Sequence, residues 1–437
     1  MQKSLVRLLT LFVLIVPLLA ACGRKPAAVP TTVPAATAAA TAAATVPPAA
    51  TAAATEAATA APTVAATAAA TTEATTTPTA AGTNSSKPRV ALVTDTGKVN
   101  DGTFNQFAYE GAKKATDELG LEFTYIETQA SADYVKNIQT LVDEKYDVII
   151  TVGFLLADAT QAAAAAHPEI AFIGVDQTYS SKAPVATVAT AAEAPTVPAT
   201  EDSAMTNNLV TLRFREDQAG FLAGALAGMM TKSGTVGIVA GMEIPPVKKY
   251  RNGYENGAKY VNPNVNPVGV YVPSFSDSAL GASTAEQMIG DGADVIFGAG
   301  GQTGSGGIKA AAAKGVYVIG VDQDEYAGPT FQGGKAPGSA KVLTSAIKRV
   351  DVAVYDQIKA IAGGTFKGKR AVIYEAKDNG VGLAPYHGTD AAISAAVKAR
   401  IDEIQKALAD GTLTTGVDPI SGDVDEKTVP TAKPFKP

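Results

Sequence analysis

The sequence contains no tryptophan, one cysteine and two histidines among its 437 residues. A single cysteine excludes an intramolecular disulfide. The two histidines, His167 and His387, offer no cluster of zinc-type ligands with that cysteine, and we expect neither a metal nor another cofactor. The formal net charge of −6 argues against a nucleic-acid partner, because phosphate binding needs a basic face.

Large apolar side chains are also scarce in two long stretches of the chain. Residues 23–86 consist almost wholly of Ala, Thr and Pro, and Ser180–Ala204 has a similar composition. Such segments cannot bury enough apolar surface to offset the entropy of ordering. We therefore expect residues 23–86 to be a disordered tether and residues 180–204 to be a disordered insertion in the folded part.

Residues 1–22 have the pattern of a secretory signal. Lys3 and Arg7 precede the apolar stretch Leu8–Ala20, which is short and interrupted by Pro17. This pattern is typical of a signal peptide rather than a spanning helix. "LAAC", ending at Cys22, resembles a bacterial lipobox and implies cleavage before Cys22 and a lipid on its sulfur; the alternative is an incidental thiol. The expected location is the extracytoplasmic face of the cell membrane, held by the lipid.

Three strand-like segments occur twice in the same order, about 147 positions apart. In each copy the third segment is a short apolar run that ends in "GVDQ". The segments are Arg89–Asp95, Tyr146–Phe154 and Phe172–Gln177, and then Thr235–Gly241, Ala293–Gly301 and Val318–Asp324. Three matches in register predict two lobes of the same design.

Between these strands lie helix-like segments, such as the one from Phe104 that ends at Gly120. Continuous apolar strands alternating with helices predict a parallel sheet covered on both faces. We expect an α/β fold of two doubly wound lobes joined by a hinge. The expected N-terminal lobe is 87–208, completed by about 328–358; the C-terminal lobe is 209–327, completed by about 359–420, with a tail at 421–437.

The predicted strands end in polar or aromatic residues, and ligands of open α/β sheets bind outside the carboxyl ends of the strands. Because both lobes carry such ends, we expect one ligand to be clamped between them. The strand-end residues are Asp95, Gly153, Phe154, Asp176, Gly241, Met242, Phe275, Gly300, Gly301 and Asp322.

Several of these segments together resemble a known family. "VTDTGKVNDGTFNQFAYEG" (Val93–Gly111), Gly220–Pro263, "GVDQD" (Gly320–Asp324) and Val342–Asp356 are similar to motifs of the basic membrane protein family of bacterial ABC-transporter receptors. The resemblance implies the fold of type I periplasmic binding proteins. It also implies that a nucleoside, with a purine favoured, is delivered to the subunits of an ABC permease. The family pattern has its base between two aromatic rings and its ribose held by acidic groups.

Carried over residue by residue, the resemblance implies a role for nine positions. Asp95 and Asn105 would hydrogen-bond the ligand, and Phe104 and Phe275 would stack on the two faces of the base. Asp322 would bind the ribose, with Gly301, Met242 and Lys348 nearby, and Asp176 matches a further strand-end position. Thr103 stands where the family more often has serine, which keeps the hydroxyl, and the insertion at 180–204 departs from the family pattern.

The residue types support the same chemistry independently. An ionised carboxylate accepts both donors of a ribose diol, and two opposed aromatic rings suit a flat heterocycle. No predicted strand end carries the Arg that a phosphate would need. The alternatives are structural: a strand-end Asp can cap the next helix, Phe104 can be a core residue, and Lys348 can be a solvated helix residue.

Other functions remain open at this point. The same fold serves receptors for sugars or other small polar solutes, and sensors that report to a membrane kinase. An enzyme would need a nucleophile paired with a base, and His387 in "PYHGTD" is a candidate base without an evident partner. We expect no catalytic residue, and a monomer, since no feature calls for an oligomer.

Overall fold

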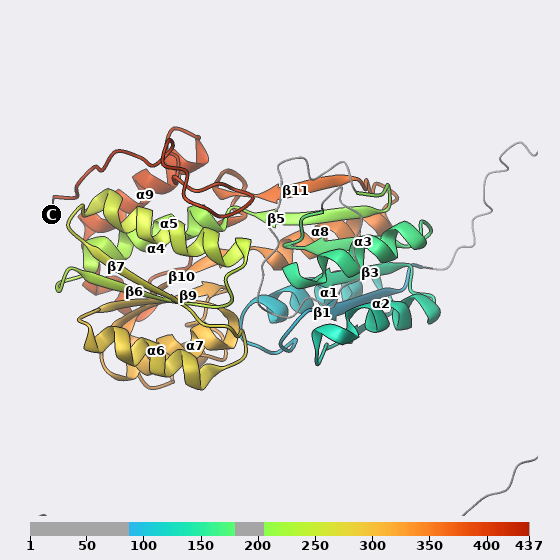
Figure 1. The fold of residues 1–437 in the computed structure, drawn as a ribbon, viewed down its shortest axis with the longest axis horizontal. Coiled ribbons are helices and arrows are strands. Elements are labelled where there is room, and N and C mark those ends of the chain that lie inside the picture. Colours follow the sequence, from blue (N-terminus) through green and yellow to red (C-terminus); the bar gives the residue numbers. More distant parts are fainter. Residues whose placement is uncertain (1–86, 180–204, 437) are drawn as a thin grey trace, which may run out of the picture. The chain divides into compact units, whose positions relative to one another are not determined.

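The computed structural model describes residues 87–179 and 205–436 of the chain. The expected signal peptide, Cys22, the tether at 23–86 and the insertion at 180–204 lie outside the described residues. Within those residues the strands form two six-stranded sheets, one in each lobe (Figure 1).

The sheet of the N-terminal lobe is parallel throughout and has the order β11-β5-β4-β3-β1-β2. Along β1, Val90 and Leu92 belong to one hydrophobic cluster and Ala91 and Val93 to another, as expected for a strand covered on both faces. Helices α1 and α8 pack on the first face, and α2 and α3 on the second. The strands are β1 (Val90–Thr94), β2 (Phe123–Ile126), β3 (Val148–Val152), β4 (Ala171–Val175), β5 (Leu209–Phe214) and β11 (Arg370–Tyr374). The helices are α1 (Phe104–Leu119), α2 (Tyr134–Asp143), α3 (Ala157–Ala166) and α8 (Val350–Ala362).

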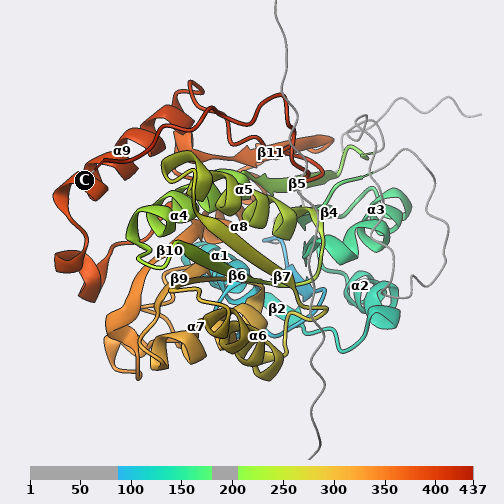
Figure 2. The same cartoon turned by 60° about the vertical axis from the view of Figure 1, so that its left-hand side comes forward.

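The sheet of the C-terminal lobe repeats this design in the order β12-β10-β9-β8-β6-β7, and β12 pairs antiparallel with β10. Helices α4 and α5 cover one face and α6 and α7 the other, which Figure 2 shows on the two sides of β6 and β7. The strands are β6 (Thr235–Ala240), β7 (Asn266–Tyr271), β8 (Val295–Ala299), β9 (Tyr317–Asp322), β10 (Val342–Lys348) and β12 (Val381–Leu383). The helices are α4 (Glu216–Met230), α5 (Pro245–Val261), α6 (Ser278–Gly290), α7 (Gly301–Ala313) and α9 (Ala395–Ala409). The predicted two-lobed α/β fold is confirmed.

The expected boundaries between the lobes were wrong at three strands. We expected residues 209–214 in the C-terminal lobe, but β5 pairs with β4 and β11 in the N-terminal sheet. We expected about 359–420 to complete the C-terminal lobe, but β11 lies in the N-terminal sheet as well. We expected 328–358 to complete the N-terminal lobe, but β10 pairs with β9 in the C-terminal sheet, and only the following α8 packs against α1. The hydrogen-bond partners of these strands cannot be identified from composition along the chain. The chain therefore crosses between the lobes directly after β5, directly after β10 and between β11 and β12.

Helices α4 and α5 approach each other closely because glycines line their contact. A Cβ on Gly224 would lie 1.9 Å from the carbonyl oxygen of Tyr254, a distance at which no side chain fits. Small residues recur through "GALAGMM" (Gly224–Met230), and nearly all of α4 is buried. In the part of the chain that the structure describes, no helix has both the length and the apolar character needed to span a bilayer.

The segment after α9 was expected to end in a tail at 421–437, and the described part of it packs along α5. The backbone N–H groups of Lys433 and Phe435 donate to the carbonyls of Tyr260 and Val261. Asn252 Nδ2 donates to Gly422 O at 2.6 Å. Residues 410–436 thus form part of the C-terminal lobe.

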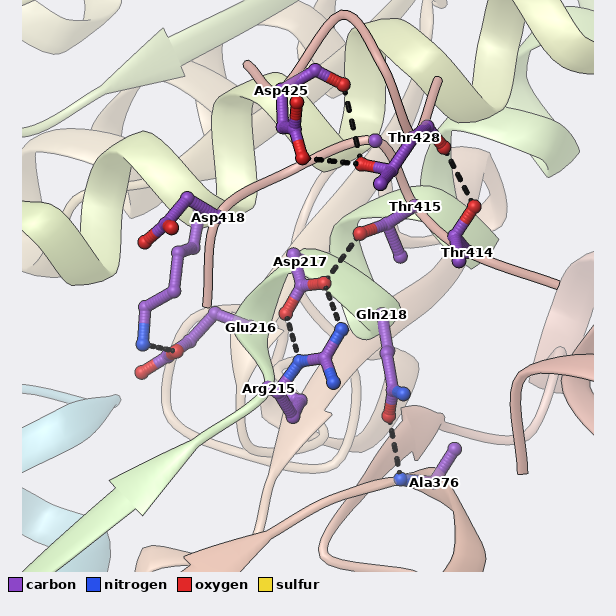
Figure 3. A network of polar contacts seen from close by, with 12 residues as sticks. Arg215, Glu216, Asp217, Gln218, Ala376, Thr414, Thr415, Asp418, Asp425 and Thr428 are labelled. Atoms are coloured by element: carbon purple, nitrogen blue, oxygen red, sulfur yellow. Dashed lines mark hydrogen bonds and ion pairs between the residues drawn. The ribbon is translucent and has the colours of Figure 1, made fainter. Parts of the chain in front are cut away.

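The same segment reaches the point where the chain enters α4 (Figure 3). Arg215 donates two hydrogen bonds to the Asp217 carboxylate, at 2.8 and 2.7 Å. Thr415 Oγ1 donates to the same carboxylate at 2.5 Å. The buried charge of Asp217 is therefore satisfied jointly by the crossover and by the C-terminal segment.

Candidate functional site

A cavity lies at the carboxyl ends of the strands of both sheets. Its volume is about 670 Å³, including the space that opens to solvent. Both lobes line it, and eight of the nine ligand-site residues expected from sequence are among its lining residues: Asp95, Phe104, Asn105, Asp176, Phe275, Gly301, Asp322 and Lys348. Five of the eight belong to the strand-end pattern, whereas Phe104, Asn105 and Lys348 came from the family resemblance, and the fold brings both groups to one cavity.

Asp95 follows β1 and is held by backbone donors. The N–H groups of Thr96 and Leu155 donate to its two carboxylate oxygens at 2.6 and 3.3 Å. Gly153 has a φ of 117° and leaves room for this side chain, because a Cβ there would lie 2.0 Å from Asp95 Oδ2. Burial, with a contribution from the nearby charge of Asp176, raises the pKa of Asp95 to about 7.

Asn105 presents an amide oxygen that lacks a partner among the described residues. Its Nδ2 donates to Asp101 Oδ2 at 3.0 Å and to Thr96 O at 2.8 Å, while Oδ1 is buried and unpaired. Asp101 also accepts from the N–H of Thr103, directly before α1, at 2.8 Å, and from the N–H groups of Asn105 and Gln106 in the first turn of α1. Asp101 was missed from sequence, although Asp three residues before a helix is a recognisable capping signal.

Asp176 and Asp322 are the two aspartates of the repeated "GVDQ", and both have left-handed backbone conformations. Their φ values are 62° and 64°, which is uncommon for a residue other than glycine, though Asp tolerates it better than most. Such positions often occur at functional sites. Burial raises the pKa of Asp176 to about 6 and that of Asp322 to about 7, against the opposing effect of Lys348.

The two aspartates have different partners. Asp176 forms an ion pair with Lys348, which ends β10. Asp322 accepts a hydrogen bond from the phenol of Tyr250 at 3.1 Å. The repeat therefore places one carboxylate beside a cation and the other beside a neutral donor.

Lys348 is buried and its charge is matched by carboxylates. Its Nζ lies 2.9 Å from Oε1 of Glu216, whose Oε2 lies 2.5 Å from Nζ of Lys249. Burial alone would lower the pKa of Lys348, but the charges of Asp176, Glu216 and Asp322 outweigh it and raise that pKa. Burial likewise opposes ionisation of Glu216, yet the two lysines lower its pKa. This network joins two crossovers, since Glu216 begins α4 after β5 and Lys348 ends β10.

Aromatic side chains enter the cavity from both lobes. Phe104 and Phe275 are half-buried, and Lys348 Nζ lies 4.8 Å from the centre of the Phe104 ring. A Cβ on Gly241 would lie 2.4 Å from Cε1 of Phe275, so the ring fits in this position because residue 241 has no side chain. Phe154 and Tyr250 also line the cavity.

Met242 is the expected site residue that does not line the cavity. It is half-buried and packs on the hydrophobic core. The N–H of Ile244 donates to the Met242 carbonyl at 2.8 Å, so the chain turns here, and Ile244 and Pro246 line the cavity instead.

His387, which had no evident partner in the sequence, is paired in the structure. Its Nε2 lies 2.6 Å from Asp324 Oδ2, and its ring stacks on Tyr326 with the ring centres 4.3 Å apart. None of these three residues lines the cavity. Among residues 87–179 and 205–436, no group of three or more His, Cys, Asp or Glu side chains could hold a metal.

Tyr250, Glu216 and Lys249 were missed from sequence. They lie on helices α4 and α5, and the expectation that ligand residues follow strands therefore does not include them. The charged run "RED" directly after β5 was a usable signal for Glu216. Nothing in the helical pattern around Lys249 and Tyr250 distinguishes them from ordinary helix residues.

Residues 88–412 match the sequence profile of the Bmp family, described as ABC transporter substrate-binding protein PnrA-like. The ABC transporter nucleoside-binding protein BmpA of Lactococcus lactis is 32% identical over 75% of this chain and 88% of its own length. A lipoprotein of Pyrococcus abyssi is 33% identical over 69% of this chain and 70% of its own length. Among solved structures, a solute-binding protein of an ABC transporter system from Aeropyrum pernix has a TM-score of 0.61 and 27% identity, covering 75% of this chain and 92% of that one.

The profile match spans both lobes and includes the residues around the cavity. The relatives agree with it over most of their length. The likeness to a solute-binding protein agrees with the two parallel-dominated sheets described above. The chain therefore belongs to the Bmp family of PnrA-like ABC transporter substrate-binding proteins and has the fold of type I periplasmic binding proteins.

Proposed function

We propose that the protein binds a nucleoside, with a purine favoured, in the cavity between its lobes and delivers it to the permease of an ABC importer. The observation that carries the proposal is the combination of two aromatic rings with several carboxylates in one cavity. Phe104 and Phe275 suit a flat heterocycle, and Asp176 and Asp322 suit the donors of a ribose diol. The L. lactis relative is named as a nucleoside-binding protein.

The edge of the base would meet the polar groups of the N-terminal lobe. Asn105 Oδ1 is a buried acceptor without a partner among the described residues, and a donor on the ligand would satisfy it. Asp95 lies in the same wall of the cavity. An unpaired buried oxygen costs free energy in the empty protein, which supports a role for Asn105 in binding.

The charges of the cavity favour an uncharged ligand over a phosphorylated one. Asp95, Asp101, Asp176 and Asp322 line it together with one cation, Lys348. Two carboxylates already pair with that lysine, so a phosphate would find no free cation among the described residues that line the cavity. We expect nucleoside 5′-monophosphates to bind far more weakly than the nucleosides.

In this proposal the protein binds its ligand and catalyses no reaction on it. Family membership implies a small-molecule ligand and a permease as partner, and the relatives above are named as binding proteins or lipoproteins. We further propose that a lipid on Cys22 holds the protein at the extracytoplasmic face of the membrane. Replacing Cys22 by Ser should release the protein from the membrane, and mass spectrometry should detect the lipid only on the native chain.

Calorimetry on lipid-free protein (residues 23–437) tests the ligand assignment. Inosine, guanosine and adenosine should bind with dissociation constants on the order of micromolar or tighter, and should raise the melting temperature by mass action. Free pentoses, a hexose panel and inosine 5′-monophosphate serve as controls. Binding of sugars with every nucleoside inert would replace the proposal by the alternative, a sugar receptor of the same fold.

A sensor that reports the same ligand to a membrane kinase would share this cavity. Transport distinguishes the two roles, because only a receptor for an importer is required for uptake. Loss of labelled nucleoside uptake in cells lacking the protein, restored by the native chain, is the expected result. Unchanged uptake would favour the sensor.

A further inference from the structure

Tyr250 contacts an aspartate of the cavity rather than solvent. Its side chain is 4% exposed, and both Tyr250 and Asp322 line the cavity. The phenol donates to Asp322 Oδ1 at 3.1 Å. The ring packs edge-on against Phe297, with ring centres 5.9 Å apart, so the phenol has little freedom to turn away.

The backbone of Tyr250 is fixed by the contact between α4 and α5. A Cβ on Gly220 of α4 would lie 2.4 Å from the Tyr250 carbonyl oxygen, so the two helices touch at this residue. The position of the phenol is therefore set by helix packing and does not depend on Asp322. A rigid donor can orient the more mobile carboxylate that it contacts.

Because the two lobes repeat the same design, the partner of Asp322 can be compared with the partner of Asp176. Asp176 occupies the position in the N-terminal lobe that Asp322 has in the C-terminal lobe, and its partner is the ammonium group of Lys348. A cation neutralises its carboxylate partner, whereas a phenol orients the carboxylate and leaves its charge in place. Asp322 is thus the member of the pair that retains a negative charge for a ligand when ionised.

We propose that Tyr250 is a positioning residue of the ligand site: it fixes Oδ1 of Asp322 and leaves Oδ2 to accept a hydroxyl of the ligand. The proposal rests on the proposed function, since it assumes a ligand with hydroxyl donors at Asp322. The charged and titratable groups that act on Asp322 are Lys348 on β10, Asp176 after β4, Asp101 before α1 and Glu325 after β9. None of these groups is changed by a substitution at Tyr250.

Tyr254, one turn further along α5, offers a matched control. It is also buried and packs on Phe297, but its hydroxyl has no partner among the described residues. Tyr250→Phe and Tyr254→Phe therefore remove the same atom from the same helix. Only the first removes a hydrogen bond to the cavity.

The first measurement is nucleoside affinity between pH 5.5 and pH 8.5 by calorimetry on lipid-free protein. Tyr250→Phe should weaken binding roughly tenfold, as expected for a hydrogen bond to a charged group. The midpoint of its pH dependence should also move upward, because the phenol favours the ionised form of Asp322. Tyr254→Phe should match the native protein in both respects. A weaker affinity with an unmoved midpoint would overturn the positioning role and make Tyr250 a direct contact.

The second measurement needs no ligand. The side-chain carboxyl carbon of Asp322, assigned by its loss in Asp322→Asn, is followed by NMR as a function of pH. Its pKa should be higher in Tyr250→Phe than in the native protein and unchanged in Tyr254→Phe. An unchanged pKa in a folded Tyr250→Phe protein would overturn the inference. If the native protein bound no nucleoside, the proposed function would fail, and this titration alone would decide the role of Tyr250.

Discussion

Phe275 is an aromatic residue of the C-terminal lobe that lines the cavity, and it allows a direct test of stacking. Phe275→Ala should weaken nucleoside binding by about 1–3 kcal/mol, the usual cost of removing a ring that stacks on a base. Calorimetry gives the value. Tyr125→Ala serves as the control, because Tyr125 lies on edge strand β2, is 44% exposed and does not line the cavity. A loss below a few tenths of a kcal/mol at Phe275 would remove it from the site.

Buried acids in and beside the cavity support a second prediction, on stability and its dependence on pH. Burial raises the pKa values of Asp95, Asp322 and Glu325 to about 7 and that of Asp176 to about 6. In the unfolded chain these groups lose their protons near pH 4. Between about pH 4 and pH 7 the folded protein therefore binds more protons, and its free energy of unfolding should fall as pH rises.

Urea denaturation of the ligand-free protein at pH 5 and pH 8 measures this effect. The native protein should be more stable at pH 5, and Asp322→Asn should show a smaller difference because one of the groups is gone. Glu216 does not disturb the comparison, since its pKa is lowered and its contribution is lost only at more acidic pH. Stability that increased from pH 5 to pH 8 would contradict the assignment of raised pKa values.

The strand-end pattern found the site residues that follow strands, and the family resemblance added Phe104 and Asn105 at the start of α1, but Tyr250 on α5 was missed. Asp95, Asp176 and Asp322 could be predicted because parallel strands bring their carboxyl ends to one edge. Tyr250 lines the cavity from α5, and Glu216 at the start of α4 contacts the lining residue Lys348; both positions depend on helix packing, which no local pattern encodes. Met242 does not line the cavity, because the chain turns at Ile244 and brings the next residues there instead.

At the scale of elements, the close contact between α4 and α5 depends on glycines, which have no side chain to separate the two helices. Gly224→Ala would place a methyl group 1.9 Å from the Tyr254 carbonyl oxygen, so the helices would have to separate. We expect a loss of roughly 2–4 kcal/mol in the free energy of unfolding, in the range of severe overpacking. Thermal and urea denaturation give the value.

Gly290→Ala is the control for this prediction. Gly290 ends α6, and a Cβ there would meet nothing within 4 Å. Alanine in a helix is favoured over glycine by up to about 1 kcal/mol, so this variant should be as stable as the native protein or slightly more so. Equal losses for the two variants would show that the close contact at Gly224 is not the cause of the destabilisation.

The elements themselves were largely predictable, whereas their assignment to lobes was not. Alternating apolar strands and helices define β1 to β4 and β6 to β9 without knowledge of the fold. The assignment of β5, β10 and β11 to lobes could not be predicted because each strand lies directly before a crossover. There the strand completes one sheet while the next helix or strand belongs to the other lobe.

At the scale of the whole molecule, the C-terminal segment stabilises the lobe on which it lies. Removal of residues 421–437 deletes the contacts of Gly422, Lys433 and Phe435 with α5. We expect a melting temperature several degrees lower, since a loss of 1–2 kcal/mol commonly shifts it by roughly that amount. Removal of residues 436–437 alone, beyond the last contact with α5, should leave it unchanged. Equal melting temperatures for the long truncation and the native protein would contradict a structural role for the segment.

Lys348 is both a wall of the cavity and the last residue of a strand from which the chain crosses to the other lobe. Its partner Glu216 occupies the first position after another crossover. Under the proposed function, the ion pair between the two crossovers therefore includes a residue of the ligand site. We expect a substitution of Lys348 to change both the affinity for the solute and the rate at which the lobes separate, so that selectivity and residence time vary together.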